Sequence, residues 1–114
     1  MNREIVEEIL TDEGYEVDSV ENGLQVVERL QVAPPDYYRL ILMDIQMPVM
    51  DGNEAARTIR ALEDKKRASI PILAVTANAF NEDRKMAKES GMNGFLTKPI
   101  RATDMLRTIE EYFG

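Results

Sequence analysis

Residues 40–52 read Leu-Ile-Leu-Met-Asp-Ile-Gln-Met-Pro-Val-Met-Asp-Gly, an apolar run that leads into a carboxylate and then a turn. An unbroken apolar run of this kind is typical of a strand covered on both faces, as in parallel sheets. Pro48 and Gly52 mark the residues after the run as a loop. The segment therefore predicts a buried strand over residues 39–44, with Asp44 at its carboxyl end.

On either side of this strand, the spacing of apolar residues alternates between the helical and the extended period. The expected strands cover residues 15–20, 39–44, 70–76 and 94–97. The expected helices begin near residue 2, after residue 23, at about residue 53, at residue 81 and after residue 99. Gly14 and Gly91 predict the ends of two of these helices. Such alternation predicts one α/β domain over residues 1–114, a parallel sheet with helices on both faces.

Composition narrows the classes of function. A formal net charge of -7 argues against direct nucleic-acid binding, which usually needs a basic face. The chain has no cysteine and no histidine, which excludes thiol nucleophiles, Cys or His metal clusters and Ser-His-Asp sites. The longest apolar runs are far shorter than the roughly 20 residues that span a bilayer, and the N-terminus has no signal-peptide pattern. We therefore expect a soluble, cytoplasmic protein without a membrane partner.

Three polar side chains follow the expected strands: Asp44, Thr76 and Lys98. In open α/β sheets, ligands bind at the carboxyl ends of the strands. Each residue also has an ordinary interpretation, as a turn residue, a local hydrogen-bonding group and a surface charge respectively. Together they supply a nucleophilic carboxylate, a hydroxyl donor and a cation, the set that suits a phosphoryl group.

Three segments carry a family resemblance: residues 40–52, residues 70–79 and residues 94–99. In that order they resemble the signature segments of the receiver domains of two-component response regulators. The resemblance covers nearly the whole chain, and from Thr76 onward it is closest to receivers of hybrid sensor kinases. It implies a flavodoxin-like (CheY-like) fold and a regulatory domain rather than an enzyme.

The resemblance implies that Asp44 accepts a phosphoryl group from a histidine kinase or a histidine phosphotransfer protein. Thr76 would then donate a hydrogen bond to the acyl phosphate, and Lys98 would pair with another phosphoryl oxygen. Asp44 and the backbone carbonyl of Gln46 would hold Mg²⁺. Phosphorylation would switch an output surface formed by the helix from residue 81, the strand at 94–97 and the last helix.

The resemblance gives further positions a tuning or switching role. The side chains of Gln46 and Asn78 would adjust hydrolysis of the phosphoaspartate, and the small Ala77 would leave the site open. Phe95 matches an aromatic residue that moves inward on activation, with plain core packing as the alternative. The peptide bond between Lys98 and Pro99 is expected to be cis.

The chain departs from the family at its start, where receivers normally carry an apolar strand that ends in two acidic residues. That strand would lie between the strands at 15–20 and 39–44. Without it we expect four strands and five helices, a weakened Mg²⁺ site and two unpaired strand edges. Our hypothesis is an N-terminally shortened receiver, whose sheet is rearranged or completed in a homodimer by exchange of elements.

Three functions remain open from the sequence. The first is a phosphoacceptor signalling domain, and the second is a phosphorylation-incompetent receiver that acts only as an interaction or dimerisation module. The third is an aspartyl-phosphate phosphatase, which would need a second Asp at the position of Gln46 and a cap insertion for which the chain has no room.

Overall fold

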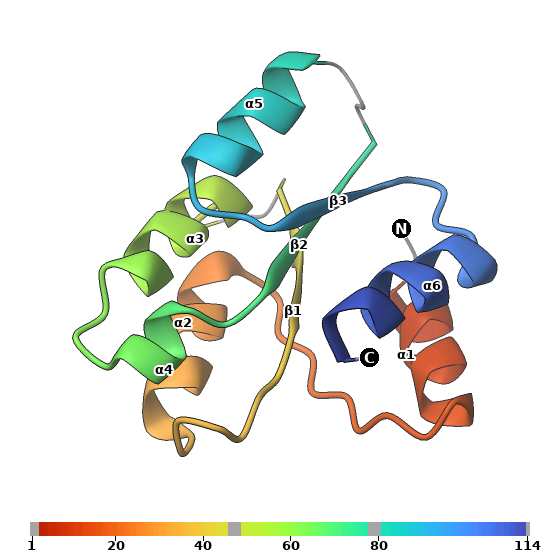
Figure 1. Cartoon of the computed structure of the whole chain (residues 1–114), viewed down its shortest axis with the longest axis horizontal. Coiled ribbons are helices and arrows are strands. Elements are labelled where there is room, and N and C mark those ends of the chain that lie inside the picture. The colour runs from red at the N-terminus through yellow and green to blue at the C-terminus, as the bar shows by residue number, and fades with distance from the viewer. Residues whose placement is uncertain (1–2, 46–48, 78–80, 114) are drawn as a thin grey trace.

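The computed structural model describes residues 3–45, 49–77 and 81–113, which form a flavodoxin-like three-layer α/β domain (Figure 1). Its centre is one open sheet of three parallel strands in the order β1-β2-β3. The strands are β1 (Ile41–Asp44), β2 (Ile72–Thr76) and β3 (Gly94–Thr97). In the register of the sheet, Asp44 lies beside Val75, and Thr76 lies beside Thr97.

Helices cover both faces of the sheet, as predicted (Figure 1). One face carries α1 (Arg3–Asp12) and α6 (Ala102–Phe113). The other carries α2 (Gly23–Val32), α3 (Gly52–Arg60), α4 (Lys65–Ala68) and α5 (Asn81–Glu89). None of the described helices is long and apolar enough to span a membrane.

Alternation along the strands divides the core into two clusters. Ile72 and Ala74 of β2 pack with Met43 in the cluster beneath α2 to α5. Leu73 and Val75 point the other way, into the cluster beneath α1 and α6. Because successive strand residues point to opposite faces, a strand covered on both sides is buried along its whole length. All of β2 is buried in this way, as its apolar sequence predicts.

The helix boundaries follow local chemistry. The side chain of Asn22 accepts a hydrogen bond from the backbone N–H of Gln25 at 2.9 Å and caps α2. Asp51 caps α3 in the same way, because its carboxylate accepts from the N–H of Glu54 at 2.8 Å. Gly14 has a positive φ of 92° directly after α1, so the predicted end of that helix is confirmed.

Two details of the predicted architecture are wrong. The described residues contain three strands and six helices, whereas we expected four and five. Residues 15–20 form no strand, since the sheet of the described residues pairs only β1, β2 and β3. The short helix α4 was not predicted, and Asp64 caps it by accepting from the N–H of Lys66 at 2.9 Å.

Side chains, rather than a ladder, hold the segment at 15–20. Tyr38 donates a hydrogen bond to Asp18 at 2.6 Å, and Arg29 lies 3.8 Å from the same carboxylate. Burial, followed by this hydrogen bond, raises the pKa of Tyr38. Ser19 donates to Glu7 of α1. The segment is therefore tied to the helices on both faces while β1 remains an edge strand of the described sheet.

In the sheet of the described residues β1 pairs with β2 alone, and it is less buried than β2. Met43 is fully buried, but Ile41 and Leu42 are partly exposed. The expectation of strands covered on both faces is confirmed: β2 is buried throughout, and β1 packs Met43 into one core cluster and Leu42 against the other.

Arg60 joins three elements at the base of α3. Its guanidinium donates to the carbonyl of Gly91 at 2.8 Å, to the carbonyl of Ala68 at 2.6 Å and to Asn93 Oδ1 at 2.8 Å. Burial lowers the pKa of Arg60. Asn93 Oδ1 also accepts from the backbone N–H of Ile72 at 2.9 Å, so the cluster holds the entrance of β2.

We expect Arg60→Met to lower the free energy of unfolding by about 2–3 kcal/mol, because partly buried acceptors lose a charged donor. Urea denaturation measures this loss. Arg107→Met is the matched control, since its ion pair with Asp104 is exposed and should contribute less than about 0.5 kcal/mol. Equal losses in the two variants would contradict the role given to the Arg60 cluster.

Candidate functional site

An ion pair marks the carboxyl edge of the sheet. Lys98 Nζ, which follows β3, lies 2.7 Å from Asp44 Oδ2 at the end of β1. The side chains are 18% and 24% exposed respectively, so the pair is accessible to solvent on one side only. The structure thus brings together two of the three residues that the sequence placed at this edge.

Thr76 ends β2 at the same edge and is 3% exposed. Its backbone carbonyl accepts a hydrogen bond from the N–H of Lys98 at 2.8 Å, which fixes the start of the segment that carries the lysine. Ala77 follows directly and is exposed. The Lys98–Pro99 peptide is cis, as the resemblance implied.

The backbone after β1 is packed closely against α3. A Cβ atom at Gly52 would lie 2.5 Å from the carbonyl oxygen of Asp44 and 2.9 Å from the Cα of Ile45. The N–H of Gly52 donates to the carbonyl of Ile45 at 3.0 Å. Only glycine permits this approach, so Gly52 helps to position Asp44 at the strand end.

Phe95 lies in β3 beside Ala74 and packs against the cluster beneath α2 to α5. The guanidinium carbon of Arg84 stands 5.1 Å from the centroid of its ring, within the range of a cation–π interaction. Phe95 thus packs partly against the core in this structure, and its switching role stays a prediction.

The predicted roles of Gln46 and Asn78 fall outside the described residues. Within the described ranges, no group of three or more Asp, Glu, His or Cys side chains is arranged to hold a metal ion. Asp51, the nearest carboxylate in sequence, is used as the cap of α3. Of the predicted metal ligands, the described residues therefore include only the carboxylate of Asp44.

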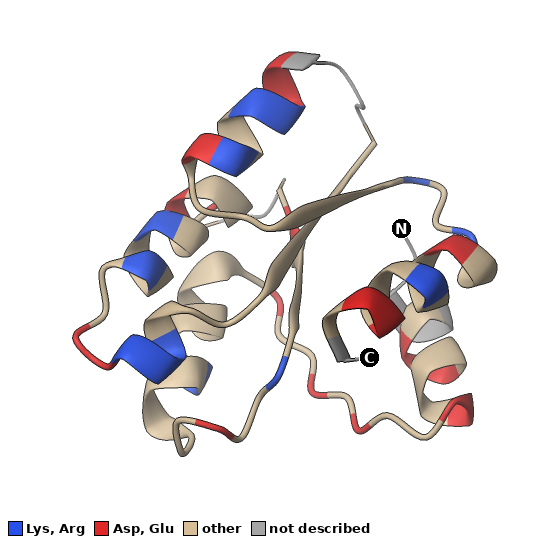
Figure 2. Ribbon diagram, in the orientation of Figure 1, with Lys and Arg blue, Asp and Glu red and all other residues tan. Residues whose placement is uncertain are grey.

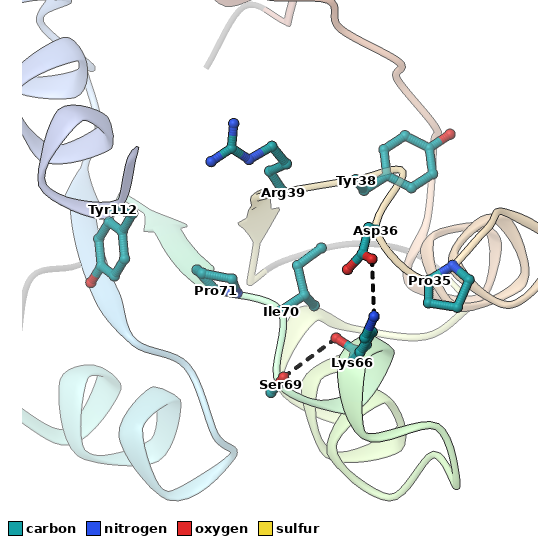
Figure 3. Close-up of a pocket in the computed structure, with 9 residues that line it drawn as sticks. All are labelled: Pro35, Asp36, Tyr38, Arg39, Lys66, Ser69, Ile70, Pro71 and Tyr112. Atoms are coloured by element: carbon teal, nitrogen blue, oxygen red, sulfur yellow. Dashed lines mark hydrogen bonds and ion pairs between the residues drawn. The ribbon is translucent and has the colours of Figure 1, made fainter. Parts of the chain in front are cut away.

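A pocket of about 410 Å³ lies at the opposite edge of the sheet, before the strands begin (Figure 3). Residues from the entrances of β1 and β2 line it together with Tyr112 of α6. Of its two cations, Arg39 and Lys66, Lys66 is 3.2 Å from Asp36 in an exposed ion pair. The distance of this pocket from the strand ends separates it from the Asp44 site.

Sequence reasoning missed two residues near the site. Arg84 looked like one of several surface cations on α5, and only the structure places it over Phe95. Asn53 is 6% exposed, and among the described residues its Oδ1 has no hydrogen-bond partner. Its position three residues before the buried Ala56 was the available signal, because residues at this spacing share a helix face.

The fold and the edge with its Asp–Lys pair define a receiver domain. The chain belongs to the response regulator receiver domain family, whose profile matches residues 1–110. It is 38% identical over 115 residues to hybrid signal transduction histidine kinase L of Dictyostelium discoideum. That match covers 98% of this chain and 7% of the kinase, so the chain spans a small part of its relative. The predicted family and its closeness to hybrid-kinase receivers are confirmed.

Solved structures agree with this assignment. The receiver domain of the sensor histidine kinase PA1611 from Pseudomonas aeruginosa has a TM-score of 0.86 and 37% identity, with 97% of this chain and 87% of that chain covered. That structure has a magnesium ion coordinated in its active-site cleft. A chain of the Saccharomyces cerevisiae complex between Ypd1 and the Ssk1 receiver domain has a TM-score of 0.87 and 30% identity, covering 96% and 79%.

We expect Gly52→Ala to destabilise the fold by about 1–3 kcal/mol, the usual cost of forcing an extra methyl group into a packed site. The direction of the change in stability is informative, because alanine has the better helix propensity and would otherwise stabilise α3. Urea denaturation measures the change. Unchanged or increased stability would show that the backbone around Asp44 can shift to make room for the methyl group without destabilising the fold.

Proposed function

We propose that this chain is a phosphoacceptor domain in which Asp44 takes a phosphoryl group from a phosphohistidine of a partner protein. The observation that carries the proposal is the ion pair between Asp44 and Lys98 at the carboxyl edge of the sheet. A lysine in contact with the acceptor provides positive charge where the oxygens of the incoming phosphoryl group would lie.

The transfer needs only bond exchange at phosphorus. A carboxylate oxygen of Asp44 forms the new O–P bond while the N–P bond to the partner's imidazole breaks, and the imidazole leaves with its electron pair. Lys98 would turn from the carboxylate to a phosphoryl oxygen, and the Thr76 hydroxyl would donate to another. The product is an acyl phosphate that water can later hydrolyse, with Gln46 and Asn78 adjusting the rate.

Magnesium does not fit the described residues well. Mg²⁺ prefers several oxygen ligands in near-octahedral geometry. The described part of the chain offers no group of three carboxylates, and the Asp44 carboxylate contacts Lys98. We therefore propose that this chain binds Mg²⁺ more weakly than other receivers do.

The proposed phosphoryl donor is a histidine kinase or a histidine phosphotransfer protein. The Ypd1–Ssk1 complex supports this class of partner, because it pairs a histidine phosphotransfer protein with a receiver domain similar to this chain. The 114 residues contain no histidine, so the donor imidazole lies outside them.

Incubation with acetyl phosphate and Mg²⁺ should add one phosphoryl group to the chain, measured by intact mass. Asp44→Asn should abolish the addition, because an amide does not attack phosphorus. Lys98→Met should slow it by about 100-fold, the usual effect of losing one electrostatic contact to the transferring group.

Asp51→Asn is the matched control for this experiment. It removes a neighbouring carboxylate, but asparagine caps helices as well as aspartate does, so α3 should stay intact and labelling should persist. Labelling that survives in Asp44→Asn would place the acceptor elsewhere. No labelling of the native chain would reject the phosphoacceptor function.

A second candidate is a receiver that works through its surfaces alone. Two observations favour it: the described residues hold no group of three or more metal-ligating side chains, and β1 is an edge strand of the described sheet, with Leu42 partly exposed. An uncovered strand edge is a template for pairing with another chain. In this version, a second copy would complete the sheet beside β1, through edge pairing or exchange of elements.

If that version is correct, the sedimentation coefficient should rise with protein concentration as a dimer forms, because edge pairing follows mass action. Sedimentation velocity over a wide range of concentrations measures this. A constant monomer value would contradict the dimer and leave the phosphoacceptor proposal untouched.

A further inference from the structure

Helix α5 is lightly anchored to the rest of the molecule. Among its described side chains from Glu82 to Glu89, only Ala87 is buried. A helix that buries so little apolar surface has a low free energy of local opening. Single contacts at its ends can therefore decide where it lies.

The two ends of α5 are held differently. At the carboxyl end, Arg57 donates to the buried Ser90 at 3.1 Å, and Arg60 donates to the carbonyl of Gly91 at 2.8 Å. Toward the amino end, the described contact with the sheet is that of the Arg84 guanidinium, 5.1 Å from the ring centroid of Phe95. The first tie is made of hydrogen bonds within one corner of the fold, whereas the second reaches directly onto β3.

Phe95 connects this contact to the Asp44 site. Phe95 lies beside Ala74 in the sheet register, and Thr76 lies two residues further along β2. Since residues i and i+2 of a strand point to the same face, Thr76 and the Phe95 ring share the face that α5 covers. Any movement of the ring on this face changes its distance to Arg84.

We propose that Arg84 latches α5 onto β3 through the ring of Phe95, and that this latch opposes phosphorylation of Asp44. The second half rests on the proposed function. A contact made in the resting arrangement stabilises that arrangement, so by linkage it disfavours any state in which the ring has moved. Arg84 is then a positioning residue, which acts on the site only through Phe95.

Charge alone does not distinguish Arg84. Helix α5 carries acidic and basic residues interleaved along its length (Figure 2). Lys85 is its exposed neighbour on the same helix. The structure gives Arg84 its role by placing it over a ring, which makes Lys85 the matched control.

Hydrogen exchange followed by mass spectrometry on the unphosphorylated chain tests the latch. Arg84→Gln should raise the opening constant of α5 by about two- to fivefold, the range of an exposed cation–π contact. Phe95→Leu should raise it similarly, and Arg84→Gln should then add nothing in the double variant. Arg84→Lys keeps the cation and should retain part of the protection, whereas Lys85→Gln should change nothing.

Acetyl phosphate labelling tests the coupling to Asp44. Arg84→Gln should speed labelling by the same two- to fivefold factor, and Lys85→Gln should not. Equal exchange in Arg84→Gln and Lys85→Gln would overturn the latch. Altered exchange with unaltered labelling would overturn the coupling. Failure of the native chain to label would reject the phosphoacceptor function. The hydrogen-exchange data would still test the contact between Arg84 and Phe95, because they are collected on the unphosphorylated chain.

Discussion

The pairing of β2 with a strand on each side is the constraint on which the site depends. Because both pairings are parallel, the carboxyl ends of all three strands meet at one edge. Asp44 and Lys98 are 54 residues apart in sequence, yet their side chains meet there at 2.7 Å. The full burial of β2 makes this arrangement stable, since its side chains carry both core clusters.

The ion pair at that edge is better understood as positioning than as stabilisation. A partly exposed pair gains little net free energy, because solvent screens it and desolvation offsets the attraction. Stability comes instead from the two core clusters and from arginines that satisfy backbone carbonyls. Arg67, for example, donates to the carbonyls of Leu30 at 3.1 Å and Ala33 at 2.5 Å, and so closes the end of α2. The edge is therefore free to exchange its partners without unfolding the domain.

How much the sequence predicted depends on how local each feature is. Glycines mark the ends of α1 and α5, so these ends were predictable. The burial of β2 was predictable from its apolar run, whatever its pairing with neighbouring strands. The outcome at residues 15–20 was not predictable, because their pattern is that of a strand but the described sheet pairs only β1, β2 and β3. Asp44, Thr76 and Lys98 could be placed at one edge from topology alone. The Arg84–Phe95 contact could not, since it depends on how α5 lies over β3.

The metal-binding part of the site and the outer edge of β1 lie at the same place in the fold. In the family pattern, one strand lies between the segment at 15–20 and β1, and the same strand ends in the acidic pair that binds metal. In the described residues, β1 is an edge strand, and no group of three or more metal-ligating side chains is found. In the family pattern, a single strand thus provides both the pairing along β1 and the carboxylates near the acceptor. The two candidate functions then differ in one physical respect, namely whether the group that covers the β1 edge carries carboxylates at its end.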